Sequence, residues 1–113
     1  MAKALRGING SLQWLVTNSR PDLAARVSLS ASATSNPTYT DLYTANKLVR
    51  QAQRHKEIPI VIPSIPLDRL VLGAFADAAW GVRPDGSSQG GYLLFACDKA
   101  LMSGQEAKLE AQT

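Results

Sequence analysis

The sequence has very few of the residues on which disulfides, zinc sites and hydrolytic triads depend. Its 113 residues include one cysteine, Cys97, and one histidine, His55. A single thiol forms no internal disulfide, and one cysteine with one histidine is too few for a zinc site. No glycine-flanked serine suits a nucleophile elbow, so a serine hydrolase triad has no support. We expect a reducing compartment, with Cys97 as a small buried apolar residue.

Long apolar runs and strong charge are also absent. No apolar run approaches the length that spans a bilayer, and residues 1–7 lack the apolar core of a signal peptide. We therefore expect an intracellular protein, cytoplasmic or nuclear, with no membrane partner. The net charge of +3 is common among proteins that touch no polyanion, so it does not identify a partner.

Apolar spacing predicts two helices at the start of the chain. Apolar side chains recur at helical spacing over residues 4–17. Pro21 and Asp22 then suit the start of a second helix, because proline fits the first turn and a carboxylate favours the positive end of the dipole. This helix should run to about residue 33 and pack against the first. Trp14, and Trp80 later in the chain, are expected to be core anchors, although isolated tryptophans could also stack on nucleic-acid bases.

A third helix is predicted over residues 40–55, with Thr38 or Thr40 as its N-cap. Its buried stripe is apolar, and a basic flank lies mostly off that stripe. The flank could contact nucleic-acid phosphates, but a solvated helix face explains it equally well. The basic flank consists of Lys47, Arg50 and Arg54.

The second half of the chain has the pattern of β-strands. Residues 58–66 are apolar and interrupted by prolines, which suits an edge strand or an extended linker. Residues 70–76 are almost continuously apolar, as in a strand buried on both faces, and residues 92–95 form the returning strand. Pro84-Asp85-Gly86 between them fits a type I turn. A short third strand is expected over residues 99–103.

Asp77 is the one charged residue near the end of the first predicted strand. Period-two alternation places it on the same side as Val71, Gly73 and Phe75. A buried, unpaired carboxylate is costly, so this residue indicates a cleft, a metal ion or a local hydrogen bond. A lone aspartate most often caps a strand end, and two-metal hydrolysis needs several converging carboxylates.

Two motifs flank the turn of the predicted hairpin. They are Phe75-Ala76-Asp77-Ala78-Ala79-Trp80-Gly81 and Ser88-Gln89-Gly90-Gly91-Tyr92-Leu93-Leu94-Phe95. This pair resembles the opening of the ribonuclease H domain in copia-type retrotransposon polyproteins, in which an aspartate and a tryptophan precede a polar loop, and a serine and a Gly-Tyr pair follow it.

The helical half is similar to the region between polymerase and ribonuclease H in the same elements. A glycine-serine-leucine helix followed by an arginine-proline-aspartate turn is a specific pair of features. The matching segments are Leu5-Arg6-Gly7, Gly10-Ser11-Leu12-Gln13-Trp14-Leu15, Arg20-Pro21-Asp22-Leu23, Val27-Ser28-Leu29-Ser30, Asp41-Leu42 and Ala45-Asn46-Lys47-Leu48-Val49-Arg50.

The resemblance implies an α+β or α/β protein that joins two pieces. Residues 1–57 would be a helical reverse transcriptase connection segment and residues 58–68 a linker or edge strand. Residues 69–113 would be the opening antiparallel strands of a ribonuclease H-like fold, truncated before its end. In the family, four acidic residues hold two magnesium ions that cleave RNA in RNA–DNA hybrids, and Asp77 matches the first, as a catalytic metal ligand.

The remaining three carboxylates should fall beyond residue 113. Glu110 faintly matches a glutamate-alanine-glutamate motif of the family and could be a second metal ligand, with Glu106 as an alternative, but a solvated helix face is the better explanation for both. The polymerase motif, a tyrosine followed two residues on by paired aspartates, is absent. We therefore expect a retroelement fragment that is inactive alone. A module that binds RNA–DNA hybrid without cleaving it, or a structural fragment that needs the remainder of the polyprotein, are the alternatives.

Overall fold

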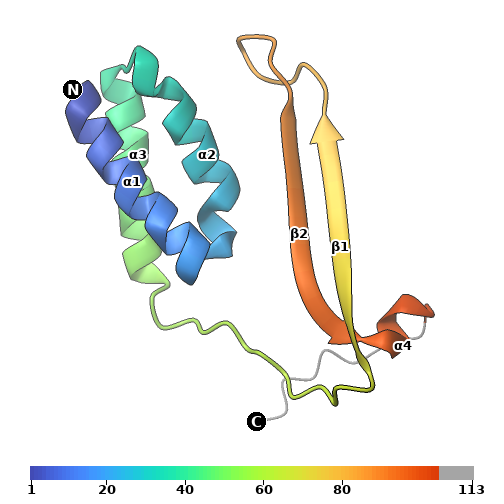
Figure 1. Ribbon diagram of the computed structural model, residues 1–113. Helices are drawn as coiled ribbons and strands as arrows, with labels where there is room; N and C mark the ends of the chain where they lie inside the picture. The colour runs from blue at the N-terminus through green and yellow to red at the C-terminus, as the bar shows by residue number, and fades with distance from the viewer. Residues whose placement is uncertain (105–113) are drawn as a thin grey trace. The chain divides into compact units, whose positions relative to one another are not determined.

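The computed structural model describes residues 1–104, in which helices are followed by a two-stranded antiparallel sheet (Figure 1). The protein is therefore a mixed α+β protein. Its internal contacts divide it into two compact units, Met1–Ile60 and a unit that begins at Val61. The division falls inside the segment 58–68 that composition marks as a boundary. Within the described chain, no helix combines the length and the apolarity needed to cross a membrane.

The first unit contains the three predicted helices. Helix α1 spans Ala2–Asn18, α2 spans Ala24–Ser32 and α3 spans Tyr39–Arg54. The second helix is bracketed by short 3₁₀ turns, Pro21–Leu23 and Ala33–Ser35. Pro21 suits the start of the first of these turns, because its fixed φ and missing N–H cost nothing in an opening turn. The helix predictions are confirmed, within one to two residues at most ends.

Helix α3 begins at the predicted cap. The Thr38 hydroxyl accepts a hydrogen bond from the Asp41 N–H at 3.3 Å, and the Asp41 carboxylate accepts one from the Thr38 N–H at 2.8 Å. This reciprocal pair satisfies two N–H groups that lack partners at a helix start. Thr38, and not Thr40, is therefore the N-cap.

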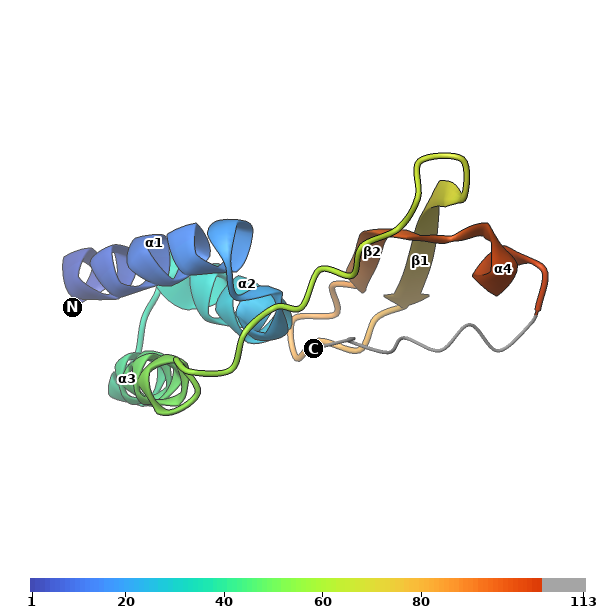
Figure 2. The same ribbon diagram turned by 90° about the horizontal axis from the view of Figure 1, so that it is seen from below.

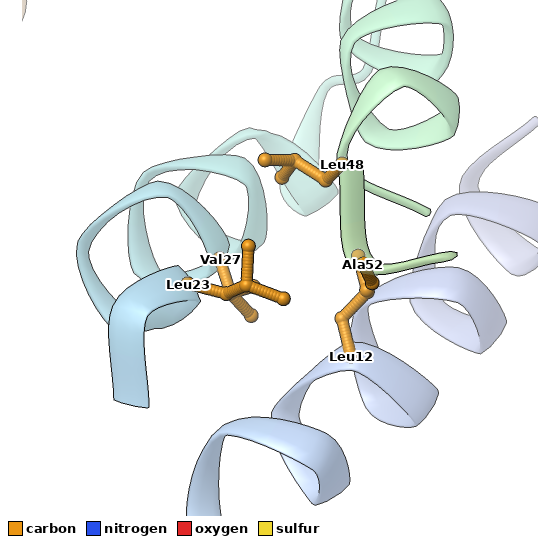
Figure 3. Packing of buried hydrophobic residues seen from close by; sticks show 5 residues of the cluster. All are labelled: Leu12, Leu23, Val27, Leu48 and Ala52. Carbon is orange, nitrogen blue, oxygen red and sulfur yellow. The ribbon is translucent and has the colours of Figure 1, made fainter. Parts of the chain in front are cut away.

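A small apolar core holds the helices together. Figure 2 looks almost along α3 and shows α1 and α2 on one side of it, and each helix contacts the other two. The core side chains point toward one another from all three helices (Figure 3). Their burial removes apolar surface from water, which is the main favourable term in folding. The five residues are Leu12, Leu23, Val27, Leu48 and Ala52.

Arg20 fastens the turn between α1 and α2 to the end of α3. Its Nη1 donates to the backbone oxygen of Ala52 at 2.7 Å, and its Nε and Nη2 donate to the Asp22 carboxylate, each at 2.9 Å. The hydrogen bond from Arg20 lowers the pKa of Asp22 below its usual value. The arginine-proline-aspartate turn therefore helps to hold α3 against the other two helices.

The second unit is built on a hairpin. Strand β1 spans Leu70–Ala79 and pairs with β2, Gln89–Asp98, in an uninterrupted antiparallel register that sets Leu70 opposite Asp98. Across the Pro84-Asp85 turn the Gly86 N–H donates to the Arg83 oxygen at 2.8 Å, as a type I turn requires. The hairpin and its turn are confirmed. Cys97 is buried, also as expected.

Two expectations about this unit are wrong. Residues 99–102 form a short helix, α4 (Lys99–Met102), in place of a third strand, because the Asp98 carboxylate caps it by accepting the Ala100 N–H at 2.9 Å. Strand β1 is not buried on both faces: among its residues only Gly73 is buried. The apolar run correctly located a strand, but the described part of the second unit supplies no second sheet to cover the hairpin.

The structure also decides two other expectations, one about the tryptophans and one about residues 58–66. The tryptophans are not core anchors, since Trp14 is 66% and Trp80 is 93% exposed. Trp80 lies at the turn end of β1, where two strands offer no surface to cover it. Residues 58–66 form no strand, so within the described residues the linker interpretation of this segment holds.

Candidate functional site

Asp77 lies on β1 opposite Gly91, and its side chain is exposed. Its Oδ1 accepts a hydrogen bond from the N–H of Ala78 at 2.8 Å. Of the three roles that the sequence left open, a local hydrogen bond is therefore the one present in the structure. Oδ2 of the same carboxylate remains available for a further contact.

The described residues do not assemble a two-ion site around Asp77. Residues 1–104 contain no cluster of three or more histidine, cysteine, aspartate or glutamate side chains that could hold a metal ion. A two-metal centre needs several converging carboxylates, and Asp77 offers one. Glu106 and Glu110, the other candidates, lie outside the described residues.

The basic flank forms one exposed stripe on α3. Lys47, Arg50 and Arg54 are separated by three and then four residues, a spacing that aligns side chains on one side of a helix. The buried side of α3 carries Ala45 and Leu48 instead. All three cations are exposed, so they are free to meet a polyanion in solution.

A shallow hollow between α2 and α3 adjoins this stripe. Its volume is about 450 Å³, and Leu29 and Leu48 supply apolar walls. Its charged lining residues are Arg26, whose Nη1 donates to Gln51, Lys47 and Asp41. Lys47 also lies with its Nζ 4.8 Å from the centre of the Tyr43 ring, a cation–π contact that positions the side chain.

The turn of the hairpin is unsuited to cradling a phosphate. The Asp85 carboxylate occupies it, accepting hydrogen bonds from the Ser87 N–H at 3.0 Å and the Ser87 hydroxyl at 2.6 Å. These bonds lower the pKa of Asp85, and the same turn also carries the cationic side chain of Arg83. The Ser87 donors are already bound within the turn, which serves to reverse the chain.

An ion pair at the base of the hairpin was not predicted from the sequence. Arg69 Nε and Nη2 donate to the two Asp98 oxygens at 2.8 and 2.9 Å, and Arg69 O accepts the Lys99 N–H at 2.8 Å. Asp98 thus binds Arg69 and caps α4 at once. The only signal in the sequence is opposite charge at the outer ends of two strands, which becomes informative once their register is known.

The Arg69–Asp98 ion pair predicts that the hairpin becomes less stable in acid. The Arg69 hydrogen bonds, and then the Ala100 N–H, lower the pKa of Asp98. A lowered pKa stabilises the fold fully above the unfolded value of about 4, and this stabilisation is lost as the pH falls through the folded value. We expect the chemical shift of the Ala100 amide and the melting temperature of the hairpin to change between about pH 6 and about pH 2. Asp98→Asn should show a smaller melting-temperature change, and equal changes would contradict the assignment.

Comparison of the chain with protein-family models, curated proteins and solved structures found no match. Assignment of this hairpin to a family therefore depends on its residues. The exposed carboxylate of Asp77 and the exposed stripe on α3 are the two features from which a function can be argued.

Proposed function

We propose that this chain is a piece of a copia-type retrotransposon polyprotein. The helical unit would correspond to the reverse transcriptase connection segment, and the hairpin to the opening strands of a ribonuclease H-like domain. One observation carries the proposal. The two segments that resemble the family, around Asp77 and around Tyr92, are paired neighbours, with Ala76 opposite Tyr92 and Asp77 opposite Gly91.

The proposal gives Asp77 the role of the first metal-binding carboxylate of a nuclease. Its position on β1 and its exposure leave Oδ2 open to a ligand. Magnesium, when held by four carboxylates, would activate water and stabilise the leaving oxygen of the cleaved RNA strand. Since one carboxylate does not bind two ions, we propose that this chain alone does not cleave RNA–DNA hybrids.

The nucleotide sequence of the transcript after the codon for Thr113 tests this assignment. The proposal expects coding for a helix that bears a glutamate and then for two further aspartates, in frame or beyond an acquired stop codon. Unrelated sequence at that place would overturn the proposed family. The readout is independent of whether the isolated chain folds or binds.

A second function is favoured by the stripe on α3. Three exposed cations on one side of a helix suit contact with successive phosphates of a nucleic-acid backbone. In this role the chain would hold an RNA–DNA hybrid without cutting it. The contact would read phosphates and not bases, so it would carry no sequence preference.

Neutralising the stripe should abolish most of the salt dependence of hybrid binding. Each phosphate contact contributes nearly one unit to the slope of log affinity against log salt, so Lys47→Gln with Arg50→Gln and Arg54→Gln should lower that slope by about 2 to 3. Fluorescence anisotropy with a labelled hybrid measures it. A control with the same charge change carries Lys3→Gln, Arg6→Gln and Lys99→Gln, all exposed elsewhere. Equal losses of slope in the two variants would show that net charge, and not the stripe on α3, determines the salt dependence.

A further inference from the structure

The free edge of β1 carries backbone groups that the hairpin does not use. In an antiparallel ladder, every second residue bonds to the partner strand and the residues between them face outward. Arg69 O accepts the Lys99 N–H, in line with the register of the hairpin, so the odd-numbered residues of β1 face β2. Consistent with this, the Ala78 N–H donates to the Asp77 carboxylate instead. The outward groups include those of Leu72, Ala74 and Ala76.

Within the described residues, this edge carries no lysine, proline or bulge that would prevent edge-to-edge pairing. Natural edge strands are usually protected by lysine, proline, a bulge or a covering element. The outward residues of β1 are leucine and alanine, and the register with β2 runs without interruption. A two-stranded hairpin is also marginally stable by itself, whereas more strands increase its stability.

We propose that two copies of the chain pair through this edge, with β1 antiparallel to β1 of the second copy about a two-fold axis at Gly73. The result is a continuous four-stranded sheet, and the interface is isologous and closed. Leu72 of one copy then stands opposite Ala74 of the other, and Leu70 opposite Ala76. Gly73 stands opposite Gly73 at the axis, where the Phe95 ring of each copy lies over its own glycine. This inference does not depend on the proposed function.

Charge complementarity selects this register. It sets Asp77 directly opposite Arg69 of the second copy, in a pair that is not hydrogen-bonded, where side chains lie closest. Arg69 uses Nε and Nη2 for Asp98, which leaves Nη1, and Asp77 uses Oδ1 for Ala78, which leaves Oδ2. The two-fold axis forms this pair twice. A shift of the axis to Ala74 would set Asp77 opposite Val71 and lose both pairs.

Charge complementarity also favours pairing through β1 over pairing through the outer edge of β2. The charge within β2 is Asp98, which is already bound to Arg69. A pairing of β2 with its copy would therefore bring no opposite charges together. The outward residues of β2 include Tyr92 and Leu94, which are bulkier than the alanines of β1.

Sedimentation equilibrium of the full chain tests the dimer. We expect a concentration-dependent monomer–dimer equilibrium that Ala74→Pro shifts to monomer, because proline removes an N–H from the pairing edge. Ala96→Pro is the matched control: Ala96 stands opposite Leu72, so its N–H faces the outer edge of β2, and the dimer should remain. A chain that stays monomeric at all concentrations would overturn the proposal, as would a dimer that persists in Ala74→Pro.

A charge variant tests the register without altering the backbone. Asp77→Arg sets like charges opposite each other twice and should raise the dimer dissociation constant at least about tenfold at low salt. Asp85→Arg makes the same charge change at the distant turn and should leave the constant within about twofold. Equal effects of the two variants would overturn the Gly73-centred register, even if a proline variant failed to fold.

Discussion

Replacing Leu23 with alanine should lower the free energy of unfolding of the helical unit by about 2–5 kcal/mol. Leu23 is completely buried, and it packs in the cluster that joins all three helices. The loss combines the transfer free energy of the deleted methyl groups with the cavity that they leave. Because a domain of this size has a small margin of stability, most of its folded population would disappear. Urea unfolding followed by the helical circular dichroism signal measures the change.

Leu29→Ala is the matched control in α2, the helix that directly follows Leu23. Leu29 is 46% exposed and lies outside the core cluster, so the same change should cost less than about 1 kcal/mol. A similar loss for both leucines would contradict the packing of α2 against α1 and α3. The comparison isolates burial, since both residues have the same helix propensity.

Replacing Gly73 with alanine should selectively open the hairpin. A Cβ at this position would lie 2.5 Å from Cζ of Phe95, whose ring covers the glycine and stacks on Phe75 with the ring centres 5.2 Å apart. Displacing a packed ring costs about 1–3 kcal/mol. Amide hydrogen exchange along β1 and β2 should accelerate by about 5- to 150-fold, since each 1.4 kcal/mol is a factor of ten.

Gly91→Ala, on the paired strand, should have the opposite effect on amide hydrogen exchange. A Cβ at Gly91 meets nothing within 4 Å, and alanine removes the entropic cost of glycine, about 0.5–1 kcal/mol. Exchange in the hairpin should therefore slow or stay unchanged. If Gly73→Ala and Gly91→Ala shift exchange in the same direction, Phe95 does not pack over Gly73 as the structure has it.

The helical half of the fold could be predicted closely from the sequence because its signals are local. The apolar spacing of α3 and the Thr38 cap both lie within one helix and do not depend on the rest of the chain. The short helix α4 was missed because its cap, Asp98, serves a second role that only the strand register reveals. Arg69 and Asp98 are 29 residues apart, and no periodicity connects residues at that separation.

The site could be predicted only in part. The sequence placed Asp77 on a strand, and the structure puts it there, but an apolar run indicates which residues favour burial and not whether another element covers them. This is why β1 was expected to be buried and is exposed. The hydrogen bond from Ala78 to Asp77 depends on which edge of β1 is free, which follows from register and not from composition.

Our central proposal is that this chain carries the first metal-binding carboxylate of a nuclease and does not cleave RNA–DNA hybrids by itself. Incubating the full chain with a labelled hybrid and magnesium, with Asp77→Asn as the control, tests it most directly. We predict that the hybrid stays intact with the unmodified chain and with Asp77→Asn, at concentrations where the chain binds it. Magnesium-dependent cleavage by the chain that is lost in Asp77→Asn would contradict the claim and show a complete catalytic site.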